Sequence, residues 1–164
     1  VPDTTMNEIA HATVCFSRAW REALYGVSAY WVLPDQVKKS APSGEFLPKG
    51  SFTIEGQRNF IKSETLKLAV GIIQLEDNDH VLTCGPPEAI KKNSICYAII
   101  EPNGSEMAEC AKKIRLEFLK IFENITRKIN IDEFVRALPA GKSQIKEISL
   151  GDLEKENIID NELE

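Results

Sequence analysis

The sequence predicts an α+β protein, a mixed α/β arrangement in which an N-terminal helix and a long C-terminal helix pack on a small mixed or antiparallel sheet. Apolar residues follow helical spacing over 5–24 and 105–128, whereas short β-branched and aromatic runs occupy much of the chain between them. The length of 164 residues and the 43% apolar content are typical of one globular domain, or of one domain with an appendage. No apolar run is long enough to cross a membrane, so we expect no membrane partner.

The first expected elements are a helix over 5–24 and a strand. Thr5 and Glu8 have the spacing of a capping box, which predicts the start of the helix, and Gly26 is expected to end it. The run SAYWVL at 28–33 is rich in aromatic and β-branched residues and predicts the strand.

Prolines and glycines predict the turns that follow. Type I turns are expected at 41–44 and 47–50, each with proline at its second position. A hairpin is expected around Gly56 and Gln57, with the pairs Glu55–Arg58, Ile54–Asn59, Thr53–Phe60 and Phe52–Ile61. Its buried face would hold Phe52, Ile54 and Ile61, and its exposed face Thr53, Glu55, Arg58 and Phe60.

The remaining elements alternate between strands and helices. Strands are expected at 66–75 (apolar enough to be central), 80–84, 94–100 and 144–148, and helices at 87–92, 105–128 and 132–138. We divide the chain into a first domain at 1–78, a smaller α/β extension at 79–148 and an acidic tail at 149–164. The tail is expected to be disordered, or helical only against a partner.

Charge is segregated along the chain. Residues 147–164 carry seven acids and one base, a net charge of −6, so the rest of the chain has a net charge of +1. Within 36–62, five bases outnumber two acids, which gives a net charge of +3. The acidic tail is therefore expected either to shield this basic patch or to face another protein.

Catalytic and metal chemistry find little support in the sequence. His80 and Cys84 share a predicted strand but stand roughly 13 Å apart, too far for a hydrogen-bonded nucleophile pair. The four cysteines lack metal-binding spacing and are expected to be reduced and mostly buried. The sequence Gly141-Lys142-Ser143 lacks the first glycine and the preceding strand of a phosphate-binding P-loop. We expect no enzyme activity, no catalytic residue, no metal site and no cofactor.

The basic patch combines cations with an exposed aromatic residue. Arg58 beside Phe60, with lysines close by, is a typical arrangement for holding phosphates and stacking unpaired bases. In the plainer interpretation Arg58 only pairs with Glu55 across the hairpin, and Phe60 is covered by a neighbour. The residues alone leave open a nucleic-acid interface, a protein-interaction surface and ordinary surface. The candidate site residues are Lys38, Lys39, Lys49, Arg58, Asn59 and Phe60.

Long motifs in the first half resemble a known family. The runs SRAW at 17–20, YWV at 30–32 and PDQVKKSAPSGEFLPKGSFTIEGQRNF at 34–60 resemble the C-terminal part of the NFACT-R domain. This domain belongs to the NFACT family of ribosome quality-control factors, which includes eukaryotic nuclear export mediator factor and bacterial fibronectin-binding-protein-like members. The runs CGPP at 84–87 and DEFVRALPAGKSQI at 132–145 resemble the tail of archaeal members.

The resemblance implies a cytoplasmic, non-enzymatic RNA-binding module. Full-length family members bind large ribosomal subunits that carry an obstructed peptidyl-tRNA, and they help to recruit tRNA for untemplated C-terminal tailing. The implied partners are tRNA, rRNA of the large subunit or both, and the remaining domains of the full-length protein. The motif positions that carry over are Trp20, Trp31, Gln36, Lys39, Gly44, Glu45, Gly50, Arg58 and Asn59. We expect the bases of the candidate site to contact phosphate, and the tryptophans and glycines to build the fold.

The sequence departs from the family pattern in two ways. The first half of the domain and the other modules of the full-length protein are missing, which predicts an exposed sheet edge and a tendency to form a homodimer. Position 57 is Gln where the family pattern leads us to expect a base, so the basic patch is expected to be weaker. The predicted function is an RNA-binding module that contacts tRNA or rRNA on stalled large ribosomal subunits. The alternative is a protein-interaction or oligomerisation domain whose basic patch binds an acidic partner.

Overall fold

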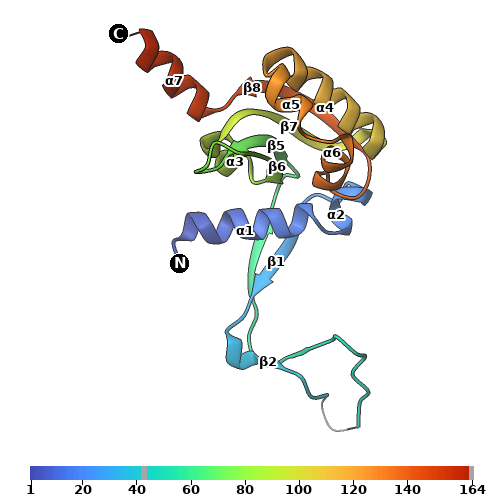
Figure 1. The fold of residues 1–164 in the computed structure, drawn as a ribbon. Coiled ribbons are helices and arrows are strands. Elements are labelled where there is room, and N and C mark those ends of the chain that lie inside the picture. The colour runs from blue at the N-terminus through green and yellow to red at the C-terminus, as the bar shows by residue number, and fades with distance from the viewer. Residues whose placement is uncertain (42–43, 163–164) are drawn as a thin grey trace.

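The computed structural model describes residues 1–41 and 44–162, so Pro42 and Ser43 of the turn expected at 41–44 lie outside the described residues. Figure 1 shows a layered body and a narrow two-stranded ribbon that extends away from it, with helix α1 (Asp3–Cys15) between them. The element order and the antiparallel sheets confirm the predicted α+β fold.

The body is built on a four-stranded antiparallel sheet in the order β6-β5-β7-β8. Its strands are β5 (Leu68–Gln74), β6 (His80–Gly85), β7 (Ser94–Ser105) and β8 (Ser143–Leu150). The strand expected to be central is β5, and its first five residues are fully buried. Since side chains alternate along a strand, Leu68, Val70 and Ile72 enter the main core, whereas Ala69 enters a smaller core on the other face.

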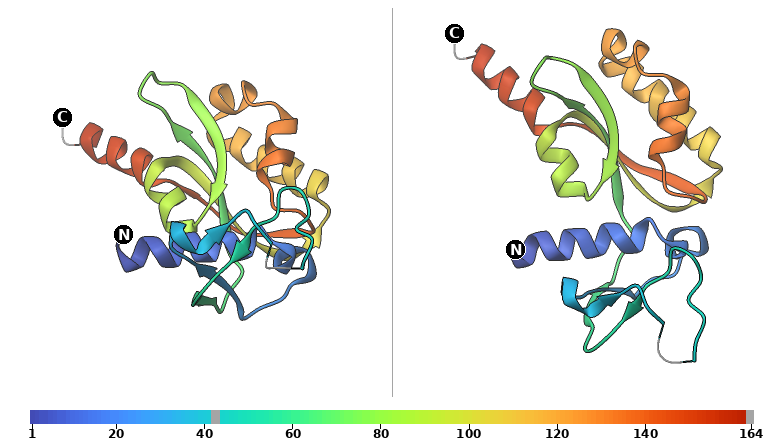
Figure 2. Two further views of the ribbon diagram at one scale, coloured as in Figure 1. Left: turned by 90° about the horizontal axis from the view of Figure 1, so that it is seen from below. Right: turned by 60° about the horizontal axis from the view of Figure 1, so that its bottom comes forward.

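Helices cover both faces of this sheet. On one face, α4 (Met107–Ile121), α5 (Glu123–Arg127) and α6 (Ile131–Ala137) complete the main core, to which α4 and α6 contribute Phe118 and Phe134. On the other face, α3 (Pro87–Asn93) packs Ile90 against Tyr97 of β7. Figure 2 shows α3 and the group α4–α6 on opposite sides of the sheet.

Both long helices expected from the sequence are divided. The C-terminal helix breaks at Phe122, where φ is −132° and ψ is 71°, so α5 is a separate short helix. The N-terminal helix breaks at Ser17, whose hydroxyl accepts a 3.1 Å hydrogen bond from the backbone N–H of Ala19 and caps α2 (Arg18–Glu22). A local capping bond thus overrides an apolar periodicity that continues through the break.

The expected ends of the N-terminal helix are also wrong. Helix α1 begins at Asp3, because the N–H of Met6 already bonds to the carbonyl of Pro2 at 3.1 Å, and Thr5 lies inside the first turn instead of capping it. Helix α2 ends at Glu22, because the next residue, Ala23, takes a left-handed conformation with φ 50°, three residues before Gly26.

Helix α2 is fastened to the far end of the chain through Trp20. This residue is 1% exposed, and its indole Nε1–H donates a 3.1 Å hydrogen bond to the hydroxyl of Ser143, the first residue of β8. Ser143 is itself buried. One buried polar contact therefore joins the first third of the chain to the last strand of the sheet.

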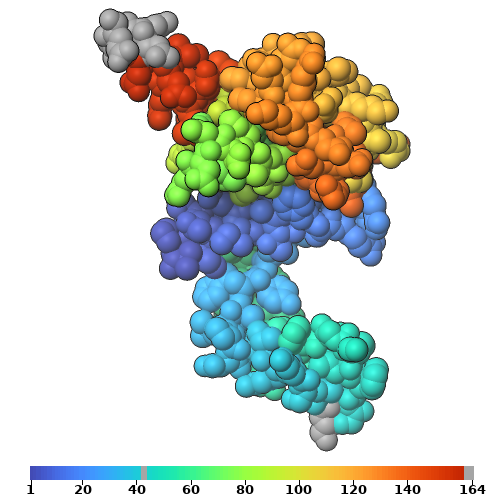
Figure 3. Space-filling model, in the orientation of Figure 1, coloured from blue at the N-terminus to red at the C-terminus, as the bar shows by residue number. Residues whose placement is uncertain are grey.

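Residues 27–41 and 44–63 form the ribbon, which we call the arm. Strand β1 (Val27–Trp31) pairs with β4 (Asn59–Ser63), and beyond them the short helix η1 (Pro34–Gln36) leads to β2 (Val37–Lys38), which pairs with β3 (Thr53–Ile54). Figure 3 shows the arm projecting from the body below α1.

The predicted hairpin around Gly56 and Gln57 does not form, because β3 and β4 pair with other strands. Ala29 opposite Ile61 gives the ribbon an apolar face that lines a hollow with Ala10 of α1. The local hairpin would have brought no helix against its apolar face. The expected burial of Phe52 is accordingly wrong, since this side chain is exposed.

The turn expected at 47–50 is displaced by one residue. The N–H of Ser51 donates a 3.0 Å hydrogen bond to the carbonyl of Pro48, so the turn spans 48–51. Gly50 then stands at its third position with φ +86°, which is the geometry of a type II turn.

The acidic tail is helical over α7 (Asp152–Glu162) rather than disordered. The N–H of Gly151 donates a 2.8 Å bond to the carbonyl of Ile95, and Leu153 packs on the main core, which fixes the start of the helix. In Figure 1, α7 points away from the body at the end opposite the arm, so it does not shield the basic patch. The domain boundary expected after residue 78 falls in the turn between β5 and β6, which pair along their length.

We expect Trp20→Phe and Ser143→Ala each to lower the free energy of unfolding by about 1–3 kcal/mol, because each leaves a buried polar group without its partner. The double variant should lose less than the sum of the two, by about 1 kcal/mol, since it leaves neither group unpaired. Urea denaturation followed by circular dichroism measures all three values. Strict additivity would show that the indole–hydroxyl bond contributes nothing of its own.

Candidate nucleic-acid interface

The two faces of the arm differ in character. Alternation places Ala29 and Ile61 on an inner face toward α1, and Tyr30, opposite Phe60, on an outer face. Phe60 is 65% exposed and Tyr30 is 46% exposed. The outer face therefore presents a pair of aromatic rings to solvent.

A cation completes this outer face. The guanidinium carbon of Arg58 lies 5.1 Å from the centroid of the Tyr30 ring, within the range of a cation–π interaction. The Tyr30 and Phe60 rings are 5.6 Å apart and inclined at 60°. We call these three residues the aromatic ledge. The plainer interpretation, an ion pair between Arg58 and Glu55, is not found among the residues that the structure describes.

The predicted lysines lie farther out, toward the tip of the arm. Lys39 and Lys49 line one hollow together with Phe52, whereas Lys38 is half-buried in β2, opposite Thr53. Within residues 1–41 and 44–162, none of the three lysines takes part in an ion pair. Their charge is therefore available to an anion.

Asn59 is placed differently from the other predicted site residues. It stands opposite Trp31 in the ribbon, and its side-chain amide donates a 3.4 Å hydrogen bond to the Trp31 carbonyl. Here the side chain serves the arm itself. The structure thus brings Arg58 and Phe60 together, brings Lys39 and Lys49 together, and sets Asn59 apart from both groups.

Gln36 fastens the middle of the arm. Its side-chain oxygen accepts a 2.8 Å bond from the N–H of Leu33, and its Nε2 donates to the carbonyls of Glu55 and Gln57 at 2.8 and 2.9 Å. Gly56 has φ +77°, and a β-carbon on it would stand 3.1 Å from Gln36 Nε2, so the position favours glycine. Sequence analysis included Gln36 among the motif positions but did not reveal this role.

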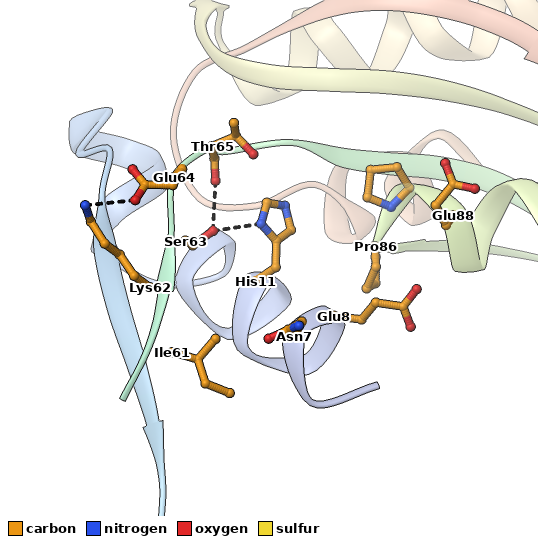
Figure 4. Close-up of a pocket in the computed structure, with 11 residues that line it drawn as sticks. Asn7, Glu8, His11, Ile61, Lys62, Ser63, Glu64, Thr65, Pro86 and Glu88 are labelled. Carbon is orange, nitrogen blue, oxygen red and sulfur yellow. Dashed lines mark hydrogen bonds and ion pairs between the residues drawn. The ribbon is translucent and has the colours of Figure 1, made fainter. Parts of the chain in front are cut away.

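A hollow at the base of the arm, between α1, β4 and α3, is drawn in Figure 4. Both ring nitrogens of His11 are hydrogen-bonded there, Nδ1 to the Ser63 hydroxyl at 2.8 Å and Nε2 to the Lys67 carbonyl at 2.6 Å. The first bond holds the end of the arm against α1, and the second holds the chain that leads from the arm into β5. The hollow is also lined by three carboxylates, Glu8, Glu64 and Glu88, which disfavour a phosphate ligand.

The cysteine environments argue against thiol chemistry. Burial raises the pKa of Cys84 to about 12, with a further contribution from Cys15, and burial raises the pKa of Cys15 to about 11. Thiols of this kind stay neutral near pH 7 and are poor nucleophiles. The described part of the chain contains no cluster of three or more acidic, histidine or cysteine side chains that could hold a metal ion. It also contains no helix long and apolar enough to cross a membrane.

Comparison with known families and proteins agrees with the resemblance found in the sequence. The family described as the NFACT protein RNA binding domain matches residues 1–56. The archaeal Rqc2 homolog aRqcH of Methanocaldococcus jannaschii is 33% identical over 145 residues, which cover 88% of this chain and 21% of that protein.

Two animal proteins match a shorter part. The ribosome quality control complex subunit NEMF homolog of Drosophila melanogaster is 39% identical over 79 residues, 48% of this chain and 8% of that protein. Human ribosome quality control complex subunit NEMF is 38% identical over 73 residues, 44% of this chain and 7% of that protein. The chain thus spans about a fifth of its archaeal relative and less than a tenth of the animal relatives. No solved structure matches it significantly.

We expect Gln36→Ala to loosen the arm without unfolding the body, because the change removes three hydrogen bonds that join 33 to 55 and 57. Amide hydrogen exchange over 53–57 should become roughly 5- to 30-fold faster, and exchange in β5 should not change. Mass spectrometry of exchanged peptides measures both. Gln57→Ala is the matched control, because it keeps the backbone carbonyl that Gln36 binds, and equal exchange in the two variants would contradict the role of Gln36.

The four thiols should react slowly with a thiol reagent at pH 8 in the folded chain and quickly in urea. Relative to the ordinary pKa of 9.0, a pKa of about 11 leaves Cys15 with about a hundredfold less thiolate. The stabilisation linked to these thiols is complete below pH 9 and is lost as the pH rises toward 12, because the unfolded chain then releases protons that the folded chain retains. Fast labelling of Cys84 in the folded chain would contradict this environment.

Proposed function

The chain belongs to the NFACT family, and we propose that it is an RNA-binding module that contacts tRNA or large-subunit rRNA on stalled large ribosomal subunits. The observation that carries the proposal is the arm, in which a net charge of +3 over 36–62 projects from a body of opposite sign. Since the whole chain has a net charge of −5, the residues outside 36–62 carry −8. Six of these eight negative charges belong to 147–164, which lead into α7 at the end of the molecule opposite the arm, so the arm is the region most favourable to RNA.

The shape of the arm supports the same conclusion. Two paired strands, β1 and β4, extend beyond α1 and carry the tip away from the sheet (Figures 1 and 3). A narrow basic projection of this kind can enter a groove of structured RNA that a compact body cannot approach. Lys38, Lys39, Lys49 and Arg58 contact phosphate in this proposal, and Phe60 contacts a base. Asn59 contributes by keeping β1 and β4 in register.

The proposed module is not an enzyme and works in the cytoplasm as one part of a longer protein. The catalytic chemistry considered from the sequence has no support in the thiol environments, and the candidate residues are cations and aromatic rings suited to binding. Delivery to the ribosome and any selection of tRNA require the remaining domains of the full-length protein, because this chain spans only about a fifth of its archaeal relative.

A second candidate function is a protein-interaction or oligomerisation surface for an acidic partner or a second copy of the chain. It is favoured by two side chains at the tip of the arm, Phe46 at 90% exposure and Phe52 at 53%. Large apolar side chains beside cations also suit an acidic polypeptide. Binding that prefers structured RNA to an acidic polypeptide separates the two functions.

We expect the triple variant Lys38→Ala/Lys39→Ala/Arg58→Ala to bind tRNA and a ribosomal RNA hairpin more weakly than the unchanged chain. It should also lose roughly two to three units of the slope of log K against log salt, because three phosphate contacts disappear. Fluorescence anisotropy of the labelled RNAs across a salt series measures both quantities, and polyglutamate is added as a competitor.

The matched control is Lys92→Ala/Lys112→Ala/Lys128→Ala, which removes the same charge from exposed positions of the body. The proposal expects this variant to retain nearly all of the affinity that the arm variant loses. Equal losses of RNA affinity in the two variants would show that only the net charge of the chain matters and would contradict a site on the arm. Efficient competition by polyglutamate would favour the acidic protein partner.

A further inference from the structure

The outer face of the arm has an aromatic pair that the stability of the ribbon does not require. Ala29 and Ile61 on the inner face already pack toward α1, and Val27 and Ala29 reach the main core. Tyr30 and Phe60 occupy the alternate positions of the two strands and are 46% and 65% exposed, although Tyr30 also borders the hollow beside α1. A cross-strand aromatic pair stabilises a ribbon modestly, but large rings left this open also form a ready contact surface.

We infer that the aromatic ledge of Tyr30, Arg58 and Phe60 is a stacking site for an unpaired RNA base. The inference rests on the proposed function and adds to it the kind of nucleotide that is recognised. Phe60 offers the most exposed ring face, and Tyr30 supports it at 5.6 Å between centroids. Base–aromatic stacking needs an open ring face, whereas a phosphate needs only charge.

Arg58 places a positive charge at one end of the aromatic ledge. Its guanidinium carbon lies 5.1 Å from the Tyr30 centroid, so the ring holds the cation at the end of the ledge toward the tip of the arm. The N–H groups at the edge of a guanidinium stay free to donate hydrogen bonds when its face rests on a ring. They can therefore hold the phosphate next to a base that stacks on Phe60.

A second cation stands at the other end of the ledge. Positions 60 and 62 are two residues apart in β4, so Lys62 lies on the same face as Phe60. Lys62 is paired with Glu64 at 2.8 Å, an exposed ion pair that contributes little stability. Arg58, just before β4, and Lys62, within it, thus place a cation on either side of the exposed Phe60 ring along the chain.

The ledge selects against a regular duplex. In a helical duplex each base is covered by its neighbours, and its face is closed to a protein ring. A loop, bulge or single-stranded end exposes that face without the free energy needed to unstack it. The lysines near the tip do not depend on an open base and serve both kinds of RNA.

Phe60→Ala tests the inference, with a single-stranded RNA of about ten nucleotides and a duplex of the same length as probes. Binding of the single strand should weaken roughly 5- to 100-fold, and binding of the duplex should change by less than about twofold. Fluorescence of 2-aminopurine placed within the single strand should be quenched by the unchanged chain and not by the variant. Phe60→Tyr, which keeps the ring, should bind like the unchanged chain.

Equal weakening of both probes, or no change in either, overturns the stacking site while the proposed RNA binding stands. Absence of RNA binding by the unchanged chain overturns both. If sedimentation instead shows that Phe60→Ala abolishes self-association while RNA binding is unchanged, the face belongs to a second copy of the chain and the inference fails. Circular dichroism establishes that each variant is folded, which is expected because Phe60 is exposed.

Discussion

The pairing of β1 with β4 across α1 is the contact on which the rest of the arm depends. It joins residues about thirty positions apart, so a long loop must be closed before the pairing gains any free energy. The compensation comes from the apolar face that Ala29 and Ile61 turn toward Ala10 of α1, and from the bonds of His11 to Ser63 and to the Lys67 carbonyl. Helix α1 therefore serves two structures at once, because Val14 and Cys15 at its end lie in the main core of the body.

The two faces of the ribbon have different roles. The inner face packs against α1 and stabilises the arm. The outer face contributes less to stability and leaves the rings of Tyr30 and Phe60 and the cation of Arg58 exposed to solvent. Beyond β1 and β4, the Gln36 side chain stabilises the arm through hydrogen bonds to three backbone groups. These bonds are needed because β2 and β3 are too short to form a stable pair by themselves. The arm is thus ordered by a few polar bonds rather than by a core of its own.

The sequence predicts all four strands of the body sheet, because runs such as that of β5 are apolar throughout and are bounded by turns. It also identifies Arg58 and Phe60 as neighbours on an exposed face. The sequence does not predict Tyr30 as their partner, because the turn signal at Gly56-Gln57 favours pairing between neighbouring segments. No sequence pattern between 31 and 59 indicates that β1 pairs with β4 instead. The breaks at Ser17 and Phe122 were missed for a related reason, since apolar periodicity continues through both and only backbone geometry interrupts it.

The closure of the arm at β2 and β3 has a consequence for how this molecule tolerates change. The tip between Lys39 and Phe52 is separated from the body by the pairs β2–β3 and β1–β4 and by the hydrogen bonds of Gln36. A change in the length of the tip therefore leaves the packing of the arm on α1 unchanged. Doubling such a loop adds only about 0.6 kcal/mol of closure entropy. The fold would therefore tolerate a longer tip, and the reach of the projection can be adjusted by engineering while its root stays the same.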